Sequence, residues 1–215
     1  MNKDKFLPIY QPYLGGNESK YLNECLDSGW ISSKGPFVDK FEQAFSSFID
    51  NPYTLSTSNG TVALHLALVA LGIVEGDEVI VPDLTFAASI NAIIYTGAKP
   101  VLVDVKRDTF NIDFSKVEEL ITSKTKAIMP VHLYGLSCDM DVCLAIAKKH
   151  KLLIVEDSAE SFGSEFKNKK TGTIGDASSF SFFGNKTITT GEGGMITFKD
   201  KETYLKAKVL RDHGM

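Results

Sequence analysis

The chain has 215 residues, of which 43% are apolar and 23% charged, and its formal net charge is −4. This composition is typical of a folded globular protein and excludes the disordered, collagen-like and disulfide-scaffold classes. The slightly acidic balance, without a long run of Lys or Arg, argues against a nucleic-acid partner. Apolar stretches fall well short of the ~20 residues of a membrane helix, and the N-terminus resembles no secretory signal, so we expect no membrane partner and a cytoplasmic location.

The residues that most often bind metals are sparse and scattered. Three cysteines and four histidines occur, and none of them shows the close pairing that is typical of structural zinc sites. An odd number of cysteines without such pairing also argues against a disulfide framework. The sequence therefore predicts no metal site.

The first part of the chain, residues 1–50, differs in pattern from the rest. Its apolar residues recur at helical spacing, without an adjacent strand pattern, at Phe37, Phe41, Ala44, Phe45, Phe48 and Ile49. Such an aromatic stripe usually packs into a core, and we favour that reading over a cofactor-binding role. We expect residues 1–50 to form an arm and a helix packed on the main body.

From residue 60 onward, strand-like and helix-like segments alternate. The predicted helices cover 61–71, 86–95, 114–121 and 140–150, and the predicted strands cover 78–82, 100–104, 126–132, 152–157, 178–183 and 194–198. Most of these strands are apolar on both faces, which is typical of buried parallel strands. The pattern predicts one α/β domain over residues 1–215, with a mostly parallel sheet between two layers of helices.

A small, glycine-containing turn, Ser58-Asn59-Gly60-Thr61, directly precedes the first of these helices. Free backbone N–H groups and the positive end of the helix dipole make such a turn suitable for binding phosphate. A simple N-cap turn is the equally plausible alternative.

The strand at 152–157 runs into a group of carboxylates at its C-terminal end, VEDSAE. Open α/β sheets bind ligands at this edge, and a carboxylate there can hold a proton on a ring nitrogen. An aspartate that only caps the next helix is the common alternative.

Two further side chains follow other predicted strands. Lys186 lies between an apolar strand and a glycine-rich turn, where a sheltered amine can act as a nucleophile, although most single lysines are surface residues. Phe86 begins a helix after the strand at 78–82 and could cover a planar ligand, although a core position is more common. Taken together, the four segments provide a phosphate site, a stacking ring, a carboxylate and an amine, which are the groups that pyridoxal 5′-phosphate requires.

The order and spelling of the segments resemble the DegT/DnrJ/EryC1/StrS family of fold-type I, aspartate-aminotransferase-like enzymes. The resemblance begins near Pro8 and rests on nine motifs, in order WISSKGPFVDKFE, SNGTVALHLAL, GDEVIVPDLTF, PVLVDV, PVHLYG, VEDSAESFGS, GDASSFSFFGNK, TTGEGGM and LRDHGM. It implies pyridoxal 5′-phosphate as cofactor. It also implies the three-layer α/β/α large domain of these enzymes, followed in the family by a small C-terminal domain that this chain does not include.

The resemblance assigns roles residue by residue. Lys186 matches the lysine that binds the cofactor covalently and shuttles a proton, and Asp157 matches the partner of the pyridine nitrogen. Glu160 matches a residue near the phenolic oxygen, and Phe86 the ring that stacks on the cofactor. Ser58, Asn59, Gly60, Thr61 and Ser181 match the residues that bind the cofactor phosphate. Trp30, Ile31 and Ser32 match the region that contacts the nucleotide sugar.

The resemblance also implies a reaction. Family members that dehydrate at C3 carry His in place of the binding lysine, so Lys186 favours transamination. The spelling of WISSKG, FFGNK and TTGEGG is most similar to members that transfer an amino group from glutamate to C4 of GDP-4-keto-6-deoxymannose, in amino-sugar and O-antigen polysaccharide biosynthesis. The active enzyme is expected to be a homodimer with a shared active site.

Two other functions remain open at this stage. The chain could bind the cofactor without turnover, as a truncated or regulatory module. A nucleotide-sugar dehydrogenase is disfavoured, because no G-x-G-x-x-G follows the first predicted strand.

Overall fold

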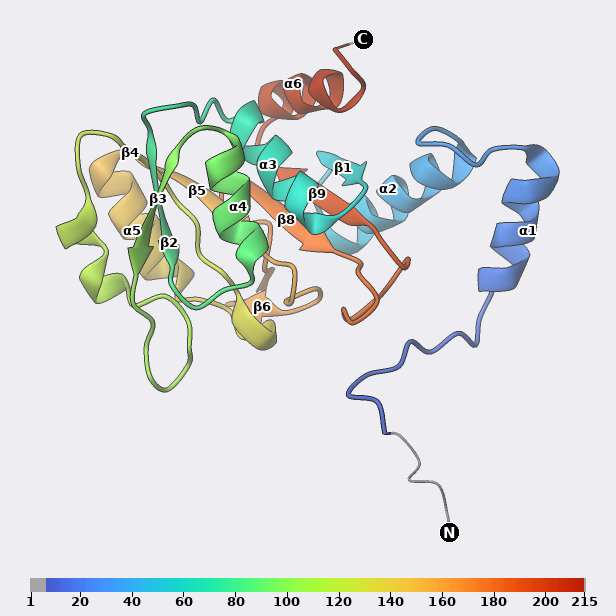
Figure 1. The fold of residues 1–215 in the computed structure, drawn as a ribbon, viewed down its shortest axis with the longest axis horizontal. Helices are drawn as coiled ribbons and strands as arrows, with labels where there is room; N and C mark the ends of the chain where they lie inside the picture. The colour runs from blue at the N-terminus through green and yellow to red at the C-terminus, as the bar shows by residue number, and fades with distance from the viewer. Residues whose placement is uncertain (1–6, 215) are drawn as a thin grey trace.

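A seven-stranded sheet forms the centre of the protein in a computed structural model that describes residues 7–214. Its strand order is β1-β9-β8-β5-β4-β2-β3 (Figure 1). The strands β8, β5, β4, β2 and β3 are parallel to one another, whereas β9 runs antiparallel to both β1 and β8. Their bounds are Thr54–Thr57 (β1), Glu78–Pro82 (β2), Lys99–Val103 (β3), Thr125–Ile128 (β4), Leu153–Asp157 (β5), Ala177–Ser181 (β8) and Gly194–Phe198 (β9). The predicted α/β class with a mostly parallel sheet is confirmed.

Helices cover both faces of this sheet. The bounds are Glu18–Ser28 (α1), Pro36–Ile49 (α2), Gly60–Ala70 (α3), Ala87–Tyr95 (α4), Met140–His150 (α5) and Lys201–Arg211 (α6). Buried residues of α3, α4 and α6 share one apolar cluster, while α5 and α2 contribute to two other clusters on the opposite face. None of the described helices is long and apolar enough to cross a membrane.

The aromatic stripe of α2 is a packing surface, as the sequence predicts. Phe45 is buried, with its ring centroid 5.0 Å from that of Phe180, and Phe41 lies 5.1 Å from Phe182 in an edge-to-face arrangement. Phe48, at the edge of the stripe, stays half-exposed and stacks on Phe162. The stripe therefore fixes the end of β8, which is the strand that leads into the loop carrying Lys186.

The predicted helix at 114–121 is wrong. Two short 3₁₀ turns, η1 (Phe114–Lys116) and η2 (Glu118–Leu120), occupy the segment, and the chain is already extended at Ile121. Side-chain hydrogen bonds at both ends favour turns over a helix: the N–H of Ser115 donates to Asp113 Oδ1, and the N–H of Thr122 donates to Thr125 Oγ1. The predicted strands 126–132 and 178–183 end earlier than expected, at Ile128 and Ser181.

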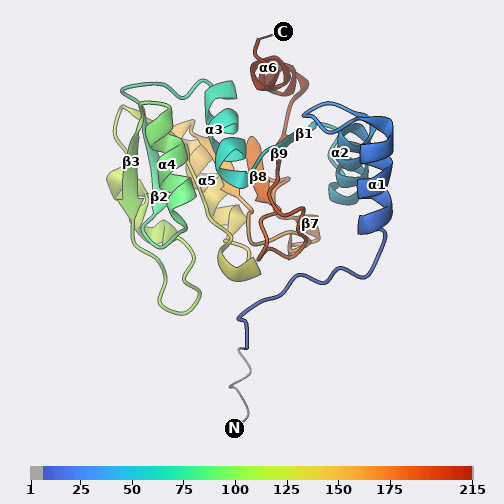
Figure 2. The same ribbon diagram turned by 45° about the vertical axis from the view of Figure 1, so that its right-hand side comes forward.

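Several elements were not predicted. The strand β1 and the helices α1 and α6 are absent from the sequence-based assignment, as is a short hairpin of β6 (Glu165–Phe166) and β7 (Lys169–Lys170). Helix α1 has no buried residue and meets α2 through the rings of Tyr21 and Phe37, 5.3 Å apart. In Figure 2 the described residues before α1 lie apart from the sheet, and all of them are exposed. Of the predicted arm and helix, the helix α2 packs on the main body and the arm over residues 7–17 does not, while residues 1–6 lie outside the described part of the chain.

Candidate active site

Two neighbouring carboxylates at the end of β5 point to opposite faces of the sheet, because side chains alternate along a strand. Glu156 is fully buried on the α5 side, where its oxygens accept hydrogen bonds from the backbone N–H groups of Gly172, Ile174 and Gly175 and lie 2.9 Å from His132 Nε2. Asp157 lies on the α4 side. Only Asp157 can therefore face a ligand on that side.

The Asp157 carboxylate is almost fully buried. Its Oδ2 accepts a hydrogen bond from Ser89 Oγ at 2.7 Å, and its Oδ1 accepts one from the backbone N–H of Ala159 at 3.1 Å. Burial raises the pKa of Asp157 above its ordinary value, while these hydrogen bonds and the charge of Lys186 act against that rise. The carboxylate thus lies in a site where a cationic partner would stabilise its charged form.

Lys186 lies in a loop that closes back on the end of β8. The backbone N–H of Phe182 donates to the carbonyl of Gly193 at 2.8 Å, and the N–H of Lys186 donates to the carbonyl of Phe183 at 3.0 Å. The Lys186 ammonium is mostly shielded from solvent and lies 3.5 Å from Glu160 Oε1. The other oxygen of Glu160 accepts the backbone N–H of Tyr134 at 2.8 Å, so the carboxylate is held in place beside the amine.

The predicted phosphate turn packs directly against β8. Asn59 caps α3 by accepting the N–H of Val62 at 2.9 Å, which leaves the turn with Ser58 exposed and Thr61 half-buried. A Cβ on Gly60 would lie 2.9 Å from the Cβ of Ser181, so only glycine allows this approach. The structure brings the start of α3 and Ser181 together, as the sequence-based assignment requires.

The polar groups of this region fit a bound pyridoxal phosphate. Ser179, which pairs in register with Asp157 on the neighbouring strand, has a buried hydroxyl without a hydrogen-bond partner among the described residues. Buried hydroxyls without a hydrogen-bond partner are rare in folded proteins. The unpaired hydroxyl of Ser179, beside the Asp157 carboxylate, is therefore available to a bound ligand. Residues 7–214 contain no cluster of three or more His, Cys, Asp or Glu suited to a metal ion.

Phe86 occupies the N-cap position of α4 and leaves 74% of its surface exposed, whereas Ser89 in the next turn is buried. The first turn of α4 therefore presents an open aromatic ring and also supports Asp157. Trp30, Ile31 and Ser32 lie exposed between α1 and α2, and within residues 7–214 no hydrogen bond or ion pair joins them to Lys186 or Asp157. Their role in binding a nucleotide sugar remains a prediction.

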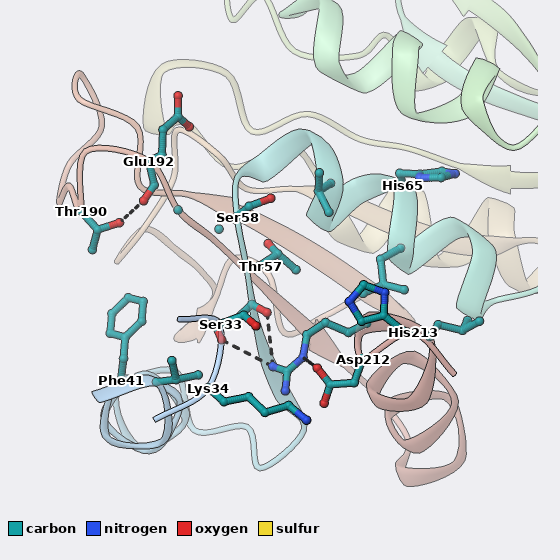
Figure 3. Close-up of a pocket in the computed structure, with 18 of the residues that line it drawn as sticks. Ser33, Lys34, Phe41, Thr57, Ser58, His65, Thr190, Glu192, Asp212 and His213 are labelled. Atoms are coloured by element: carbon teal, nitrogen blue, oxygen red, sulfur yellow. Dashed lines mark hydrogen bonds and ion pairs between the residues drawn. The ribbon is translucent and has the colours of Figure 1, made fainter. Parts of the chain in front are cut away.

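A cavity of about 910 Å³ adjoins the phosphate turn (Figure 3). It is lined by parts of α2, α3, α6, the end of β1 and the loop after Lys186, and it shares Ser58 with the turn. Arg211 crosses one side of it and pairs with Glu42 at 2.6 Å. Neither Lys186 nor Asp157 lines this cavity, so it lies beside the Lys186–Asp157 site.

Sequence reasoning missed three supporting groups. Ser89 holds Asp157, the backbone of Tyr134 holds Glu160, and Glu156 with His132 fixes the far side of β5. Each contact joins segments more than 20 residues apart. Of these groups, only Ser89 could have been suspected from the sequence, because it lies within an apolar helical segment. A buried serine hydroxyl needs a hydrogen-bond partner.

Comparison with known proteins gives consistent matches. A GDP-perosamine synthase of Escherichia coli O157:H7 is 56% identical over 98% of this chain, and the chain spans 58% of that protein's length. The crystal structure of an aminotransferase from Psychrobacter cryohalolentis superposes with a TM-score of 0.93 at 39% identity, over 98% of this chain and 53% of that one. NtdA from Bacillus subtilis, with bound PMP, superposes with a TM-score of 0.84 at 36% identity, over 89% of this chain and 43% of that one.

Residues 12–215 match the DegT/DnrJ/EryC1/StrS aminotransferase family along almost the whole chain. The match includes every segment that contributes to the site at the ends of β5 and β8. The chain belongs to the DegT/DnrJ/EryC1/StrS aminotransferase family.

Proposed function

We propose that the chain is the cofactor-binding part of a pyridoxal-phosphate-dependent aminotransferase. The observation that carries the proposal is that the Lys186 ammonium lies 3.5 Å from Glu160 Oε1. Glu160 follows Asp157 by three residues at the end of β5, whereas Lys186 is 29 positions from Asp157 in the sequence. The close approach of Gly60 to Ser181 supplies a phosphate site beside them. The cofactor, when bound, supplies an aldehyde for the amino group and an electron-accepting ring.

Each residue has a definite task in this proposal. Asp157 holds a proton on the pyridine nitrogen, and Phe86 covers one face of the ring. The N-terminal turn of α3 and the Ser181 hydroxyl bind the phosphate. Lys186 Nζ is the attachment point, and once released it moves a proton at the substrate carbon.

The proposed amino donor is glutamate, and the proposed acceptor is GDP-4-keto-6-deoxymannose, aminated at C4. The similarity to the GDP-perosamine synthase of E. coli O157:H7 supports this substrate. We expect the reaction to take place in the cytoplasm, in the synthesis of O-antigen polysaccharide, and to require a homodimer whose subunits share the active site.

Covalent labelling tests the cofactor site. The protein is incubated with pyridoxal phosphate, treated with borohydride and digested, and the labelled lysine is located by mass spectrometry. We expect the label on Lys186 in the wild type and in the control K199A, which removes an exposed lysine paired with Asp176, and its loss in K186A. A label that persists in K186A at the same stoichiometry would refute the assignment.

Protein loaded with pyridoxal phosphate but not treated with borohydride also allows turnover to be tested, because reduction would fix the cofactor on the lysine and block the reaction. A single turnover with glutamate should release one 2-oxoglutarate per bound cofactor, and subsequent addition of the GDP-keto sugar should restore the starting absorbance. Cofactor binding without release of 2-oxoglutarate would support a binding module in place of an enzyme. If a dTDP-linked keto sugar restores the starting absorbance and the GDP-linked sugar does not, GDP is rejected as the nucleotide of the substrate.

A further inference from the structure

The buried hydroxyl of Ser89 makes a contact that its place in a helix does not require. Serine hydroxyls inside helices usually bond to a carbonyl one turn back, yet Ser89 Oγ bonds to Asp157 Oδ2, 68 positions away in the chain. Ser89 is fully buried, so no water competes for this bond. The interaction therefore ties the first turn of α4 to the end of β5.

The direction of the hydrogen bonds follows from their chemistry. An ionised carboxylate can only accept, so the single hydroxyl proton of Ser89 goes to Asp157. Thr85 Oγ1 lies 2.7 Å from Ser89 Oγ, and it must then donate its own proton to Ser89. The result is a two-step relay from Thr85 to Ser89 to Asp157, in which each donor strengthens the next.

The relay acts on a carboxylate in a costly environment. Burial favours the neutral acid, whereas a hydrogen bond to the carboxylate favours the charged form. Besides Ser89, the titratable groups that act on Asp157 are Lys186, in the loop after β8, and His132, in the loop after β4. His132 faces the other carboxylate: its Nε2 lies 2.9 Å from Glu156 Oε2, and its Nδ1 accepts the backbone N–H of Cys138.

We propose that Ser89, supported by Thr85, is a positioning residue that keeps the Asp157 carboxylate ionised and aimed across the site. Only an ionised Asp157 can hold a proton on the pyridine nitrogen of the cofactor. Because Phe86 opens the same turn of α4, the element that presents the stacking ring also sets the charge of the acid. The cofactor part of the inference rests on the proposed function, whereas the effect on Asp157 does not.

The test without cofactor is a titration of Asp157 by NMR with ¹³C-labelled aspartate, with the resonance assigned from D157N. In S89A we expect the pKa of Asp157 to rise by about 1 to 2 pH units, which corresponds to the free energy of one lost hydrogen bond to a charged group. S89T, which keeps the hydroxyl, should titrate like the wild type. T85V, which removes only the outer donor, should give a smaller rise of the same sign.

The matched control is S178A. Ser178 is also buried, but its hydroxyl donates to the carbonyl of Glu156 on the other face of the sheet. S178A should leave the titration of Asp157 unchanged. An unchanged pKa in S89A, or a rise in S89T as large as that in S89A, would overturn the proposal. If S89A does not fold, the pKa of Asp157 is compared between T85V and S178A. A higher pKa in T85V than in S178A supports the proposal, and equal values overturn it.

A second readout uses the protein loaded with ¹⁵N-labelled pyridoxal phosphate. The pyridine ¹⁵N shift should indicate a protonated nitrogen in the wild type and S89T, and a lower pKa of that nitrogen in S89A. Equal nitrogen titration in all three variants would overturn the role toward the cofactor. Failure of every variant to bind the cofactor, with the Asp157 titration behaving as expected, would reject the proposed function and leave the relay intact.

Discussion

Gly60 and Ser181 approach so closely that a Cβ on the glycine would lie 2.9 Å from the serine Cβ. The first turn of α3 is thereby pressed against the last residue of β8, and the free N–H groups of the turn lie beside the Ser181 hydroxyl. Several results can be expected from this and related contacts.

In G60A, the new methyl group must push α3 away from β8. Overpacking of this kind lowers the free energy of unfolding by about 1 to 3 kcal/mol. Because the shift also moves the N–H groups of the turn away from Ser181, we expect the affinity for pyridoxal phosphate to fall about tenfold, equivalent to about 1.4 kcal/mol. Fluorescence titration with the cofactor measures the effect. The control G16A, where the nearest atom is an exposed glutamate oxygen 3.4 Å away, should bind normally. Equal affinity of G60A and wild type would contradict a phosphate site at this turn.

Loss of the Phe86 ring should affect binding more than stability. The ring is 74% exposed, so F86A should change the free energy of unfolding by less than about 0.5 kcal/mol. Its loss removes a stacking partner that contributes about 0.5 to 1.5 kcal/mol, and cofactor affinity should fall by a few-fold to tenfold. Y95A, at the other end of α4, removes another exposed ring and serves as the control. If Y95A weakens binding as much as F86A does, stacking by Phe86 is not the cause.

Glu156 should matter for stability. Burial alone would raise the pKa of Glu156, but hydrogen bonds from His132 and from backbone N–H groups outweigh it and hold the pKa below its ordinary value. In E156Q the amide NH2 group must face backbone N–H donors. We therefore expect the free energy of unfolding, measured in urea, to fall by about 2 to 4 kcal/mol. The control E165Q, at an exposed carboxylate, should lose less than about 0.5 kcal/mol. A loss in E156Q no greater than that in E165Q would show that the buried charge is dispensable.

Asp200 should give the stability a dependence on acid pH. It caps α6, and the backbone N–H of Thr203, assisted by the Thr203 hydroxyl, holds the pKa of Asp200 below its ordinary value. A lowered folded-state pKa contributes stability that is present above the unfolded-state value near 4 and is lost as the pH falls through the folded-state value.

Unfolding of wild type, D200N and D200A between pH 7 and pH 2 tests this. D200A should lose about 1 kcal/mol at pH 7, since it removes the cap acceptor. D200N keeps an acceptor and should lose less, and its difference from wild type should shrink as the pH falls through the lowered folded-state pKa of Asp200. A difference between D200N and wild type that is constant with pH would exclude the charge of Asp200 as its origin.

Much of the fold could be predicted because the spacing of apolar residues within a segment indicates which of its faces are buried. Strands such as β2 and β5 are continuous apolar runs, and α5 repeats its apolar residues at helical spacing. The 114–121 segment has the same apolar spacing but forms two 3₁₀ turns, with hydrogen bonds to the side chains of Asp113 and Thr125 at its two ends. The strand β1 is only four residues long, and α6 buries only Ala207, so neither gave a clear pattern.

The amino-acid sequence by itself determined the residue types of the site and their order, because a small turn, a strand-end acid and a single lysine are local features that local pattern records. The family resemblance already favoured Asp157 over Glu156, but only the tertiary structure decided that the Asp157 side chain faces α4 and that the Ser89 hydroxyl supports it. The physical reason is that strand register and helix docking depend on the packing of the whole core. A hydrogen bond between α4 and β5 has no signature in either segment alone.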